Sequence, residues 1–269
     1  MPEGPEVQSV IQMINNSDVI GVGITAVEVF GKKIEIRDRV AEFIGQKIKN
    51  VERRGKWMFF NLDNLMLLVH LRMTGKFLFH PIEKQSPVVI FHFENGHKLL
   101  YCDPRGFGRM LIQPLDSFKL LLPYREIGPD PMHEEFTSEY LFSRTKRSGR
   151  NIKTFLLDQK ELCAIGNIYA SEILFVSKIH PLVKAKDLSY EEVESITRNA
   201  RLILNKAVDK GGTSVADFIS PLQTPGEYQN HLKVYARKKQ PCYECSCPIE
   251  VLKLGGRSSF FCPKCQLFK

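Results

Sequence analysis

Helical periodicity marks the first stretch of the chain. Its apolar residues recur at the spacing of one helix face: Val7, Val10, Ile11 and Ile14. Because residues three and four apart share a face of an α-helix, this pattern predicts a short amphipathic helix over residues 7–14. Glu6 would then lie in the first turn of that helix, near the positive end of its dipole.

From about Gly21 to Gln113 the pattern changes to short apolar runs. The runs cover residues 24–30, 57–60, 65–71, 88–93 and 98–102. Turn-forming residues separate them, and Asn95-Gly96 is a strong signal for a β-hairpin. Short runs between turns are typical of strands, so we expect an antiparallel β-sandwich or a β-barrel in this half of the chain.

The second half of the chain has a helical pattern. Before it, the proline-rich residues 114–135 indicate a connecting segment. Ser189 and Glu192 have the spacing of a capping box, and the apolar stripe that follows them ends at Gly211-Gly212. Residues 217–232 hold turn formers without periodicity, which predicts a long loop.

These changes of pattern divide the chain into four segments. We expect an N-terminal β-sandwich over residues 1–113, a linker over 114–135, a helical domain over 136–232 and a C-terminal cysteine-containing segment over 233–269. The predicted fold class is therefore α+β.

The charge balance indicates an acidic partner. The chain carries 38 Lys and Arg against 30 Asp and Glu, for a formal net charge of +8 and a pI of about 9.1. Nucleic acid is the first candidate partner and a membrane surface the second. The sequence lacks a run of about 18 apolar residues, and its N-terminus is acidic. We therefore expect neither a membrane-spanning helix nor a signal peptide, and a cytosolic location, or a nuclear one in a eukaryote.

Four cysteines near the C-terminus have the spacing of a structural zinc site. Cys242-x2-Cys245 is followed, after sixteen residues, by Cys262-x2-Cys265. Four thiolates fill a tetrahedral zinc ion and leave no open position, so we expect one structural rather than catalytic zinc. Gly255-Gly256 lies between the pairs and would let a hairpin bring them together. The alternative is a set of unmetallated thiols.

The remaining cysteines are not assigned to the metal. Cys102 and Cys163 lie in apolar sequence, where buried free thiols are common. Cys247 follows a cysteine pair by two residues and is interpreted as a bystander. A reducing compartment with one metal site explains these cysteines better than a disulfide framework does.

The cysteine segment is also rich in cations. Residues 231–269 contain the acidic residues Glu244 and Glu250 against a larger basic set: Lys233, Arg237, Lys238, Lys239, Lys253, Arg257, Lys264 and Lys269. Arg257 comes directly after the expected hairpin turn, where its side chain could reach a phosphate. The alternative is a solvated basic face.

The first residues indicate a nucleophile. Methionine is readily removed before a small residue, which would leave Pro2 as a free secondary amine. A terminal amine titrates near pH ~8 and a lysine near ~10.4, so far more of the terminal amine is unprotonated at neutral pH. Its adduct with an aldehyde is an iminium, which stays charged and can drive an elimination. The alternative is that Pro2 and Pro5 only rigidify an N-terminal arm.

Three motifs in this order resemble one known family. They are the start Pro2-Glu3-Gly4-Pro5-Glu6-Val7, the block from Gly166-Asn167 to Glu172, and the four-cysteine segment. Together they resemble the formamidopyrimidine-DNA glycosylases, whose family includes endonuclease VIII. The resemblance covers essentially the whole chain. It implies an N-terminal β-sandwich, a helix–two-turn–helix domain and a β-hairpin zinc ribbon that bind damaged duplex DNA.

The resemblance assigns catalytic roles to four residues. Pro2 is similar to the nucleophile that attacks C1′ of the damaged nucleotide, and Glu3 to the acid that opens the sugar ring. Glu6 is similar to the carboxylate that holds the extruded nucleotide and the N-terminus. Lys56 is similar to a lysine that contacts phosphate, although a lysine that opens a strand is usually only solvated. One of the two carboxyl groups needs a raised pKa to act as an acid.

The resemblance also assigns DNA contacts. Met73 would fill the space left by the extruded base, Arg105 would bind the orphaned cytosine and Phe107 would wedge the neighbouring step. The alternative for this triplet is ordinary packing of β-turns. The triplet favours the formamidopyrimidine branch, whereas the opening Pro-Glu-Gly-Pro-Glu is also common in the endonuclease VIII branch.

Further contacts would come from the second half of the chain. Lys153, Asn167 and Arg257 are similar to residues that bind phosphates, and residues 211–231 resemble the loop that closes over an extruded oxidised purine. Two segments depart from the family pattern: Cys163-Ala164-Ile165, where small residues and a glycine are usual, and Lys84-Gln85-Ser86-Pro87, where a basic element is common.

The expected function is therefore bifunctional repair of damaged DNA. The enzyme would extrude oxidised purines such as 8-oxoguanine and formamidopyrimidines, excise them as a DNA glycosylase, and cleave the strand as an abasic-site lyase by β- and δ-elimination. It would need zinc but no redox or nucleotide cofactor, and it would act as a monomer on double-stranded DNA. The alternatives are an endonuclease VIII-like preference for oxidised pyrimidines or abasic sites, and a non-catalytic damage-binding protein.

Overall fold

The computed structural model describes residues 1–31, 34–81, 86–214 and 220–268. They form two compact units. Unit 1 contains Met1–Glu126 and Lys210–Gln229, and unit 2 contains Ile127–Asp209 and Asn230–Lys269. Each unit is described by itself, and the segment boundaries expected at residues 113, 135 and 232 remain predictions.

Unit 1 begins with helix α1, Gly4–Asn15. Pro5 lies in the first turn, where its missing N–H costs no helical hydrogen bond, and Glu3 and Glu6 form a capping box. The expected helix is therefore present and starts a few residues earlier. Its predicted apolar face is buried: Val7, Val10, Ile11 and Ile14.

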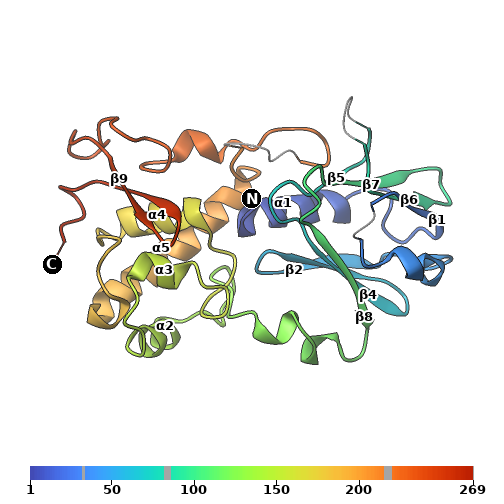
Figure 1. Ribbon diagram of the computed structural model, residues 1–269, viewed down its shortest axis with the longest axis horizontal. Helices are drawn as coiled ribbons and strands as arrows, with labels where there is room; N and C mark the ends of the chain where they lie inside the picture. The colour runs from blue at the N-terminus through green and yellow to red at the C-terminus, as the bar shows by residue number, and fades with distance from the viewer. Residues whose placement is uncertain (32–33, 82–85, 215–219, 269) are drawn as a thin grey trace. The chain divides into compact units, whose positions relative to one another are not determined.

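Within the described residues, the strands of unit 1 form two antiparallel sheets of four strands each. The first sheet has the order β1-β6-β7-β5 and the second the order β2-β3-β4-β8. Their bounds are β1 Ile24–Val29, β2 Asn50–Arg54, β3 Trp57–Asn61, β4 Leu65–His70, β5 Lys76–Leu78, β6 Val89–Phe93, β7 Lys98–Cys102 and β8 Arg109–Pro114 (Figure 1). The expected sandwich is confirmed, and there is no closed barrel among these strands.

One apolar core joins the two sheets and α1. On β6 the alternate residues Val89, Phe91 and Phe93 enter this core, while Ile90 and His92 point to the other face. Burying one such side chain stabilises the fold by roughly 1.5–3 kcal/mol. The core therefore fixes which face of each strand packs toward the interior and where the loops between the strands emerge.

The strand predictions were correct for the long apolar runs and incomplete elsewhere. Each predicted run is a strand: β1, β3, β4, β6 and β7. The β6–β7 hairpin turns at Gly96, with φ +79°, as Asn95-Gly96 indicated. The missed strands are β2, which carries Arg53 and Arg54, the three-residue β5, and β8, which mixes polar and apolar residues. All three are edge strands that pair on one side only, and their short, polar or mixed sequences carry little strand pattern.

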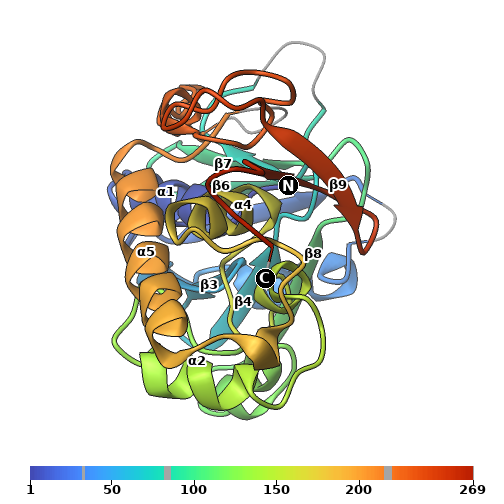
Figure 2. The same cartoon turned by 90° about the vertical axis from the view of Figure 1, so that its left-hand side faces the viewer.

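Unit 2 is helical apart from its C-terminal hairpin. Its α-helices are α2 Ser138–Thr145, α3 Ile152–Leu156, α4 Asn167–Val176 and α5 Tyr190–Asp209, and the last contacts α2 and α4 (Figure 2). The capping box before α5 is confirmed, because the Ser189 N–H donates to Glu192 Oε2 at 3.0 Å and the Glu192 N–H donates to Ser189 Oγ at 3.3 Å. The predicted apolar stripe faces the interior, with Ile203 half-buried at its edge.

The C-terminal hairpin consists of β9, Glu250–Leu254, and β10, Arg257–Phe261. Gly255 and Gly256 form its turn with φ +53° and +76°, a backbone conformation that favours glycine. The hairpin predicted between the two cysteine pairs is therefore confirmed. Strand β10 contacts α4, which places the hairpin beside the first turn of that helix.

The expected loop after α5 is only partly described, because residues 215–219 lie outside the described residues. Its base is closed by hydrogen bonds within unit 1: the Tyr228 N–H donates to the Gly212 carbonyl at 3.0 Å, and the Gly226 N–H donates to Ser214 Oγ at 2.9 Å. In the described part of the chain, every helix is too short or too polar to cross a bilayer.

Candidate active site and nucleic-acid contacts

The first residues of the chain are built into the interior of unit 1. Pro2 is buried, and Glu3 and Glu6 are only 3% and 2% exposed. The Glu3 N–H donates to Glu6 Oε2 at 2.8 Å, and the Thr213 N–H donates to Glu6 Oε1 at 2.7 Å. This is not a free arm stiffened by prolines, since the segment is held from both sides.

Lys56 lies at the same end of α1. Asn15, at the other end of the helix, hydrogen-bonds both backbone groups of Val51 at 2.7 and 2.8 Å, and Gln8 Oε1 accepts from Arg53 Nε at 2.9 Å. The helix therefore runs antiparallel to β2, so its N-terminus lies toward the β2–β3 turn that holds Lys56. Lys56 is 6% exposed, so it is not a solvated surface lysine.

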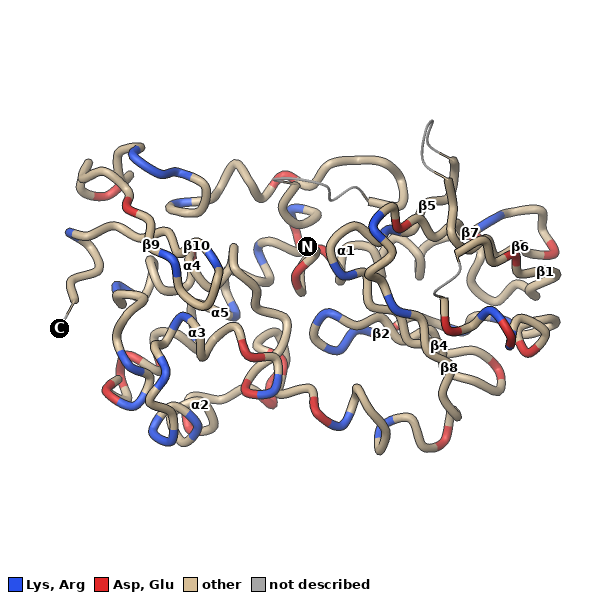
Figure 3. The backbone as a smooth tube through the Cα atoms, viewed as in Figure 1, with Lys and Arg blue, Asp and Glu red and all other residues tan. Residues whose placement is uncertain are grey.

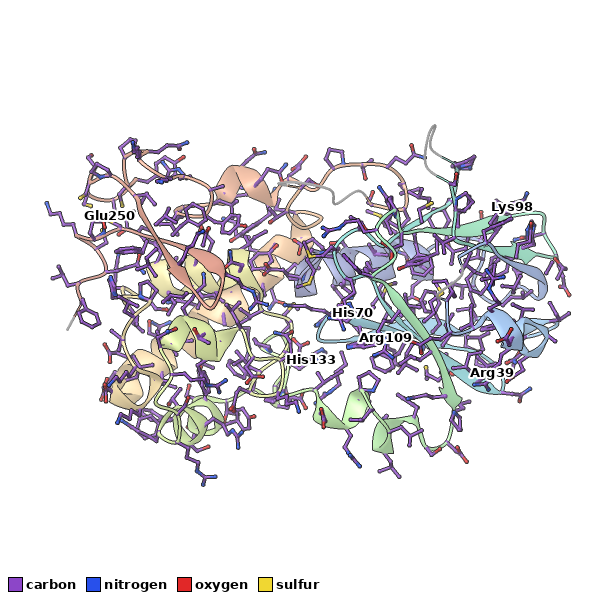
Figure 4. The ribbon with its side chains drawn as sticks, viewed as in Figure 1. Arg39, His70, Lys98, Arg109, His133 and Glu250 are labelled. Atoms are coloured by element: carbon purple, nitrogen blue, oxygen red, sulfur yellow. The ribbon has the colours of Figure 1, made fainter. Side chains whose placement is uncertain are left out.

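His70, at the end of β4, lies in a positive environment. Burial, together with the charges of Arg72, Lys56 and Arg109, lowers the pKa of His70 to about 3. The Arg72 N–H donates to His70 Nδ1 at 3.0 Å. Figure 4 labels His70 and Arg109, which face each other across β4 and β8. A neutral imidazole lets these cations gather without adding another positive charge.

Two loops of unit 1 carry the predicted base-replacing residues. The first loop, residues 71–75, presents Met73, which is 41% exposed, and the second loop, residues 103–108, presents Phe107, which is 55% exposed. The Arg105 guanidinium lies 5.1 Å from the centre of the Phe107 ring. Neither apolar tip is packed into the core of unit 1, and a guanidinium lies beside the Phe107 ring.

The two loops are joined by a carboxylate that the sequence analysis did not single out. Asp103 is 4% exposed; its Oδ1 accepts from Thr74 Oγ1 at 2.6 Å and its Oδ2 from the Gly108 N–H at 2.6 Å. The Arg105 N–H donates to Thr74 Oγ1 at 3.4 Å. The only available signal was an aspartate at the start of an Asp-Pro turn, which does not reveal the partner loop.

In unit 2 the structure brings Asn167 to the strand that begins with Arg257. Asn167 is the first residue of α4, and its Nδ2 donates to the Ser258 carbonyl at 2.9 Å. The preceding residue, Arg257, is exposed at the start of β10, and Figure 3 shows the basic positions of this hairpin. Among the described residues, Asn167 Oδ1 is buried without a hydrogen-bond partner. A helix N-terminus beside a strand that begins with an exposed arginine is a suitable phosphate site.

Lys153 lies beneath that site rather than on the open surface. It is 1% exposed, and its Nζ donates to the Asn167 carbonyl at 3.1 Å and to Ser171 Oγ. Its ammonium therefore adds positive charge under the first turn of α4.

Glu172 anchors the chain that leads to the cysteines, a role missed from sequence. Its carboxylate accepts backbone N–H bonds from Lys233, Val234 and Tyr235 at 2.8, 3.0 and 2.8 Å. Burial raises the pKa of Glu172, and these bonds oppose that effect. A glutamate inside an otherwise apolar helix was the available signal.

The four predicted cysteines form one cluster. Their sulfur atoms lie within 4.8 Å of one another, with Cys242 and Cys265 3.9 Å apart and Cys245 and Cys262 3.4 Å apart. A tetrahedral zinc ion with Zn–S bonds of about 2.3 Å separates its sulfurs by roughly 3.8 Å, so these residues fit zinc. Cys247 lies outside the cluster.

The first departure from the expected pattern has a structural consequence. Ala164 adopts φ +69°, a conformation suited to the glycine expected nearby. Cys163 holds the same turn, because its N–H donates to the Pro129 carbonyl at 3.0 Å and its thiol to Asp130 Oδ2 at 3.3 Å. The second departure is only partly described, since Lys84 and Gln85 lie outside the described residues.

Comparisons with known proteins agree across the whole chain. Residues 1–110 match the formamidopyrimidine-DNA glycosylase N-terminal domain, and residues 127–218 match the formamidopyrimidine-DNA glycosylase H2TH domain. A formamidopyrimidine-DNA glycosylase of Bacillus licheniformis is 40% identical over 99% of both chains. This chain belongs to the formamidopyrimidine-DNA glycosylase family, as the three motifs indicated.

Solved structures of one relative are similar in fold. A mutant of the Lactococcus lactis enzyme bound to DNA with a formamidopyrimidine lesion has a TM-score of 0.92 and 30% identity, covering 99% of this chain and 100% of that one. The same enzyme bound to DNA with an oxidised pyrimidine has a TM-score of 0.91, 30% identity and the same coverage.

Proposed function

We propose that this protein excises oxidised purines from duplex DNA and then cleaves the strand at the resulting abasic site. The observation that carries the proposal is the N-terminus: Pro2 is buried, as are Glu3 and Glu6, in a chain of this family. A segment that served only as a rigid arm would not need two buried carboxylates.

The proposed chemistry starts after removal of Met1. The Pro2 nitrogen attacks C1′ with its lone pair and loses its N–H proton, and the damaged base leaves with the electrons of the glycosidic bond and takes up one proton in exchange. As the family resemblance implies, we assign proton donation to the sugar ring oxygen to Glu3. Glu6, which accepts backbone hydrogen bonds from Glu3 and Thr213, would hold the N-terminus. Ring opening yields an iminium between Pro2 and C1′. When C2′ loses a proton, the iminium draws the electrons of that C–H bond. The 3′ phosphate then leaves, and the 5′ phosphate follows in a second elimination.

Base extrusion is assigned to the two loops of unit 1. Met73 and Phe107 present exposed apolar side chains that can fill the space left in the stack. Arg105 is held beside Phe107 and carries donors suited to the orphaned cytosine. We therefore propose that these three residues enter the duplex together.

Phosphate binding is assigned to cations in both units. Arg257 and Asn167 would both contact a phosphate at the start of α4. Lys153 supplies positive charge beneath that position. Lys56 supplies charge near the N-terminus. Cys242, Cys245, Cys262 and Cys265 would bind the zinc ion. The bound zinc would then fix the hairpin that carries Arg257.

A second candidate function is removal of oxidised pyrimidines. It is supported by the similarity to the Lactococcus lactis enzyme bound to oxidised-pyrimidine DNA. Relative excision rates on duplexes with 8-oxoguanine opposite cytosine, formamidopyrimidine and thymine glycol separate the two. A non-catalytic damage-binding protein would excise none of these lesions.

The test of the nucleophile is borohydride trapping on an abasic-site duplex. We expect the wild type to form a covalent adduct and Pro2→Gly to lose most trapping and strand cleavage. Wild-type cleavage by Pro2→Gly, or an active preparation whose mass retains Met1, would overturn the assignment. We also propose a monomer that acts in the bacterial cytoplasm on the nucleoid, which light scattering and cell fractionation can test.

A further inference from the structure

The hydroxyl of Tyr101 is a buried polar group without a hydrogen bond. Tyr101 is 0% exposed on β7, and among the described residues its Oη has no partner. The ring itself is well packed, with its centre 5.3 Å from that of Phe77. A phenylalanine would pack in the same way without the cost of an unpaired hydroxyl. The hydroxyl therefore needs a reason beyond packing.

The position of the hydroxyl gives that reason. It lies under both DNA-filling loops: a Cβ on Gly75 of the first loop would be 2.5 Å from Tyr101 Oη, and a Cβ on Gly108 of the second loop 1.7 Å from it. Each loop thus approaches the hydroxyl closely through a glycine. Any movement of either loop changes the surroundings of this oxygen.

Asp103 is the acceptor within reach. The same Cβ position on Gly108 is 3.0 Å from Asp103 Oδ2 and 1.7 Å from Tyr101 Oη. The Tyr101 and Asp103 oxygens therefore lie close to each other. Asp103 Oδ2 accepts one hydrogen bond from the Gly108 N–H, and a carboxylate oxygen can accept a second. Burial and the charge of Asp103 raise the pKa of Tyr101, so the hydroxyl keeps its proton.

We propose that Tyr101 is a positioning residue for base extrusion. When Met73 and Phe107 enter the duplex, the second loop shifts and the Tyr101 hydroxyl donates to Asp103 Oδ2. Because Asp103 also holds Thr74, the new bond stabilises the inserted arrangement of both loops. This hydrogen bond does not stabilise the free protein, in which the Tyr101 hydroxyl is unpaired. The inference rests on the proposed function of these loops.

The test is Tyr101→Phe on two substrates. On a duplex with 8-oxoguanine opposite cytosine, we expect the single-turnover excision rate to fall about tenfold, because a hydrogen bond to a charged acceptor is lost only in the extruded state. Fluorescence of 2-aminopurine beside the lesion should report slower extrusion. On an abasic-site duplex, which has no damaged base to unstack, cleavage and borohydride trapping should stay within about twofold of wild type. The melting temperature should not fall.

Tyr140→Phe is the matched control. The Tyr140 hydroxyl donates to the Glu161 carbonyl at 2.9 Å, far from these loops in sequence. This variant should melt at a lower temperature and excise at the wild-type rate. Wild-type excision by Tyr101→Phe, equal slowing on both substrates, or a lower melting temperature would overturn the inference. Failure of the wild type to trap the abasic site would instead overturn the proposed function.

Discussion

Glu6 Oε1 accepts a 2.7 Å hydrogen bond from the backbone N–H of Thr213, a residue 207 positions later in the chain. The other oxygen of the same carboxylate accepts from the Glu3 N–H at 2.8 Å. One side chain therefore connects the first turn of α1 with the base of the segment after α5. The position of Pro2 and the position of that segment depend on each other.

Gly212 makes this connection possible, which predicts a strong effect of Gly212→Ala. The residue has φ +81°, and a Cβ there would lie 2.9 Å from Glu6 Cγ and 2.9 Å from its Oε1. We expect a loss of about 3 kcal/mol in the free energy of unfolding, from backbone strain and overpacking, and a clear loss of excision. Urea unfolding and single-turnover excision measure both.

The neighbouring glycine is the control. Gly211 has φ +69°, but a Cβ there would meet only a Gly226 Cα at 3.6 Å. Gly211→Ala should therefore cost only about 1–2 kcal/mol of backbone strain and leave excision near wild type. Equal effects of the two substitutions would contradict the role given to Glu6.

His70 predicts a pH dependence of stability. The unfolded histidine binds a proton near pH ~6.5. In the folded protein burial lowers the pKa of His70 to about 3. Between these values the unfolded state holds more protons, so the free energy of unfolding falls as the pH falls, by up to about 1.4 kcal/mol per pH unit. Urea unfolding from pH 7 to 4 should show a shallower slope for His70→Gln.

The exposed His97 provides the comparison for this slope. His97→Gln should keep the acid sensitivity of the wild type, because it leaves the buried imidazole of His70 in place. If His70→Gln and wild type lose stability in parallel, the buried imidazole is not the cause of the acid sensitivity.

The cysteine cluster predicts one zinc ion per chain. Cys245→Ala removes a member of the cluster and should abolish tight zinc binding, expose the C-terminal hairpin to protease and weaken DNA binding. Cys247→Ala should retain zinc, because Cys247 lies outside the cluster. Zinc released by a mercurial reagent, quantified with a coloured chelator, measures the content. Equal zinc loss in the two variants argues against this ligand set.

Arg257 predicts a uniform effect on DNA affinity. Arg257→Ala removes an exposed cation beside the N-terminus of α4 and should weaken binding at all sequences. The slope of log affinity against log salt should become shallower by about one, as expected for one lost phosphate contact. Lys206→Ala, an exposed cation near the end of α5, serves as the control and should change the slope less. The same slope change in both variants would assign the effect to net charge alone.

The sequence alone determined the features that depend on near neighbours in the chain. The capping box of Ser189 and Glu192, the turns at Gly96 and Gly255, and the spacing of the cysteines all involve residues a few positions apart. Local backbone geometry fixes such interactions, so their residue types are recognisable before any folding. The family resemblance rested on the same kind of local motif.

Only the tertiary structure decided which distant residues meet. Thr74 and Asp103 are 29 residues apart, Asn167 and Ser258 are 91 apart, and Glu6 and Thr213 are 207 apart. Chain packing, not local pattern, brings these pairs within hydrogen-bond distance. The burial of Lys56 also depends on the fold: a lysine at a turn is ordinarily solvated, and here the side chain is only 6% exposed. Side chains whose partners come from elsewhere in the fold carry no sequence signal of those partners.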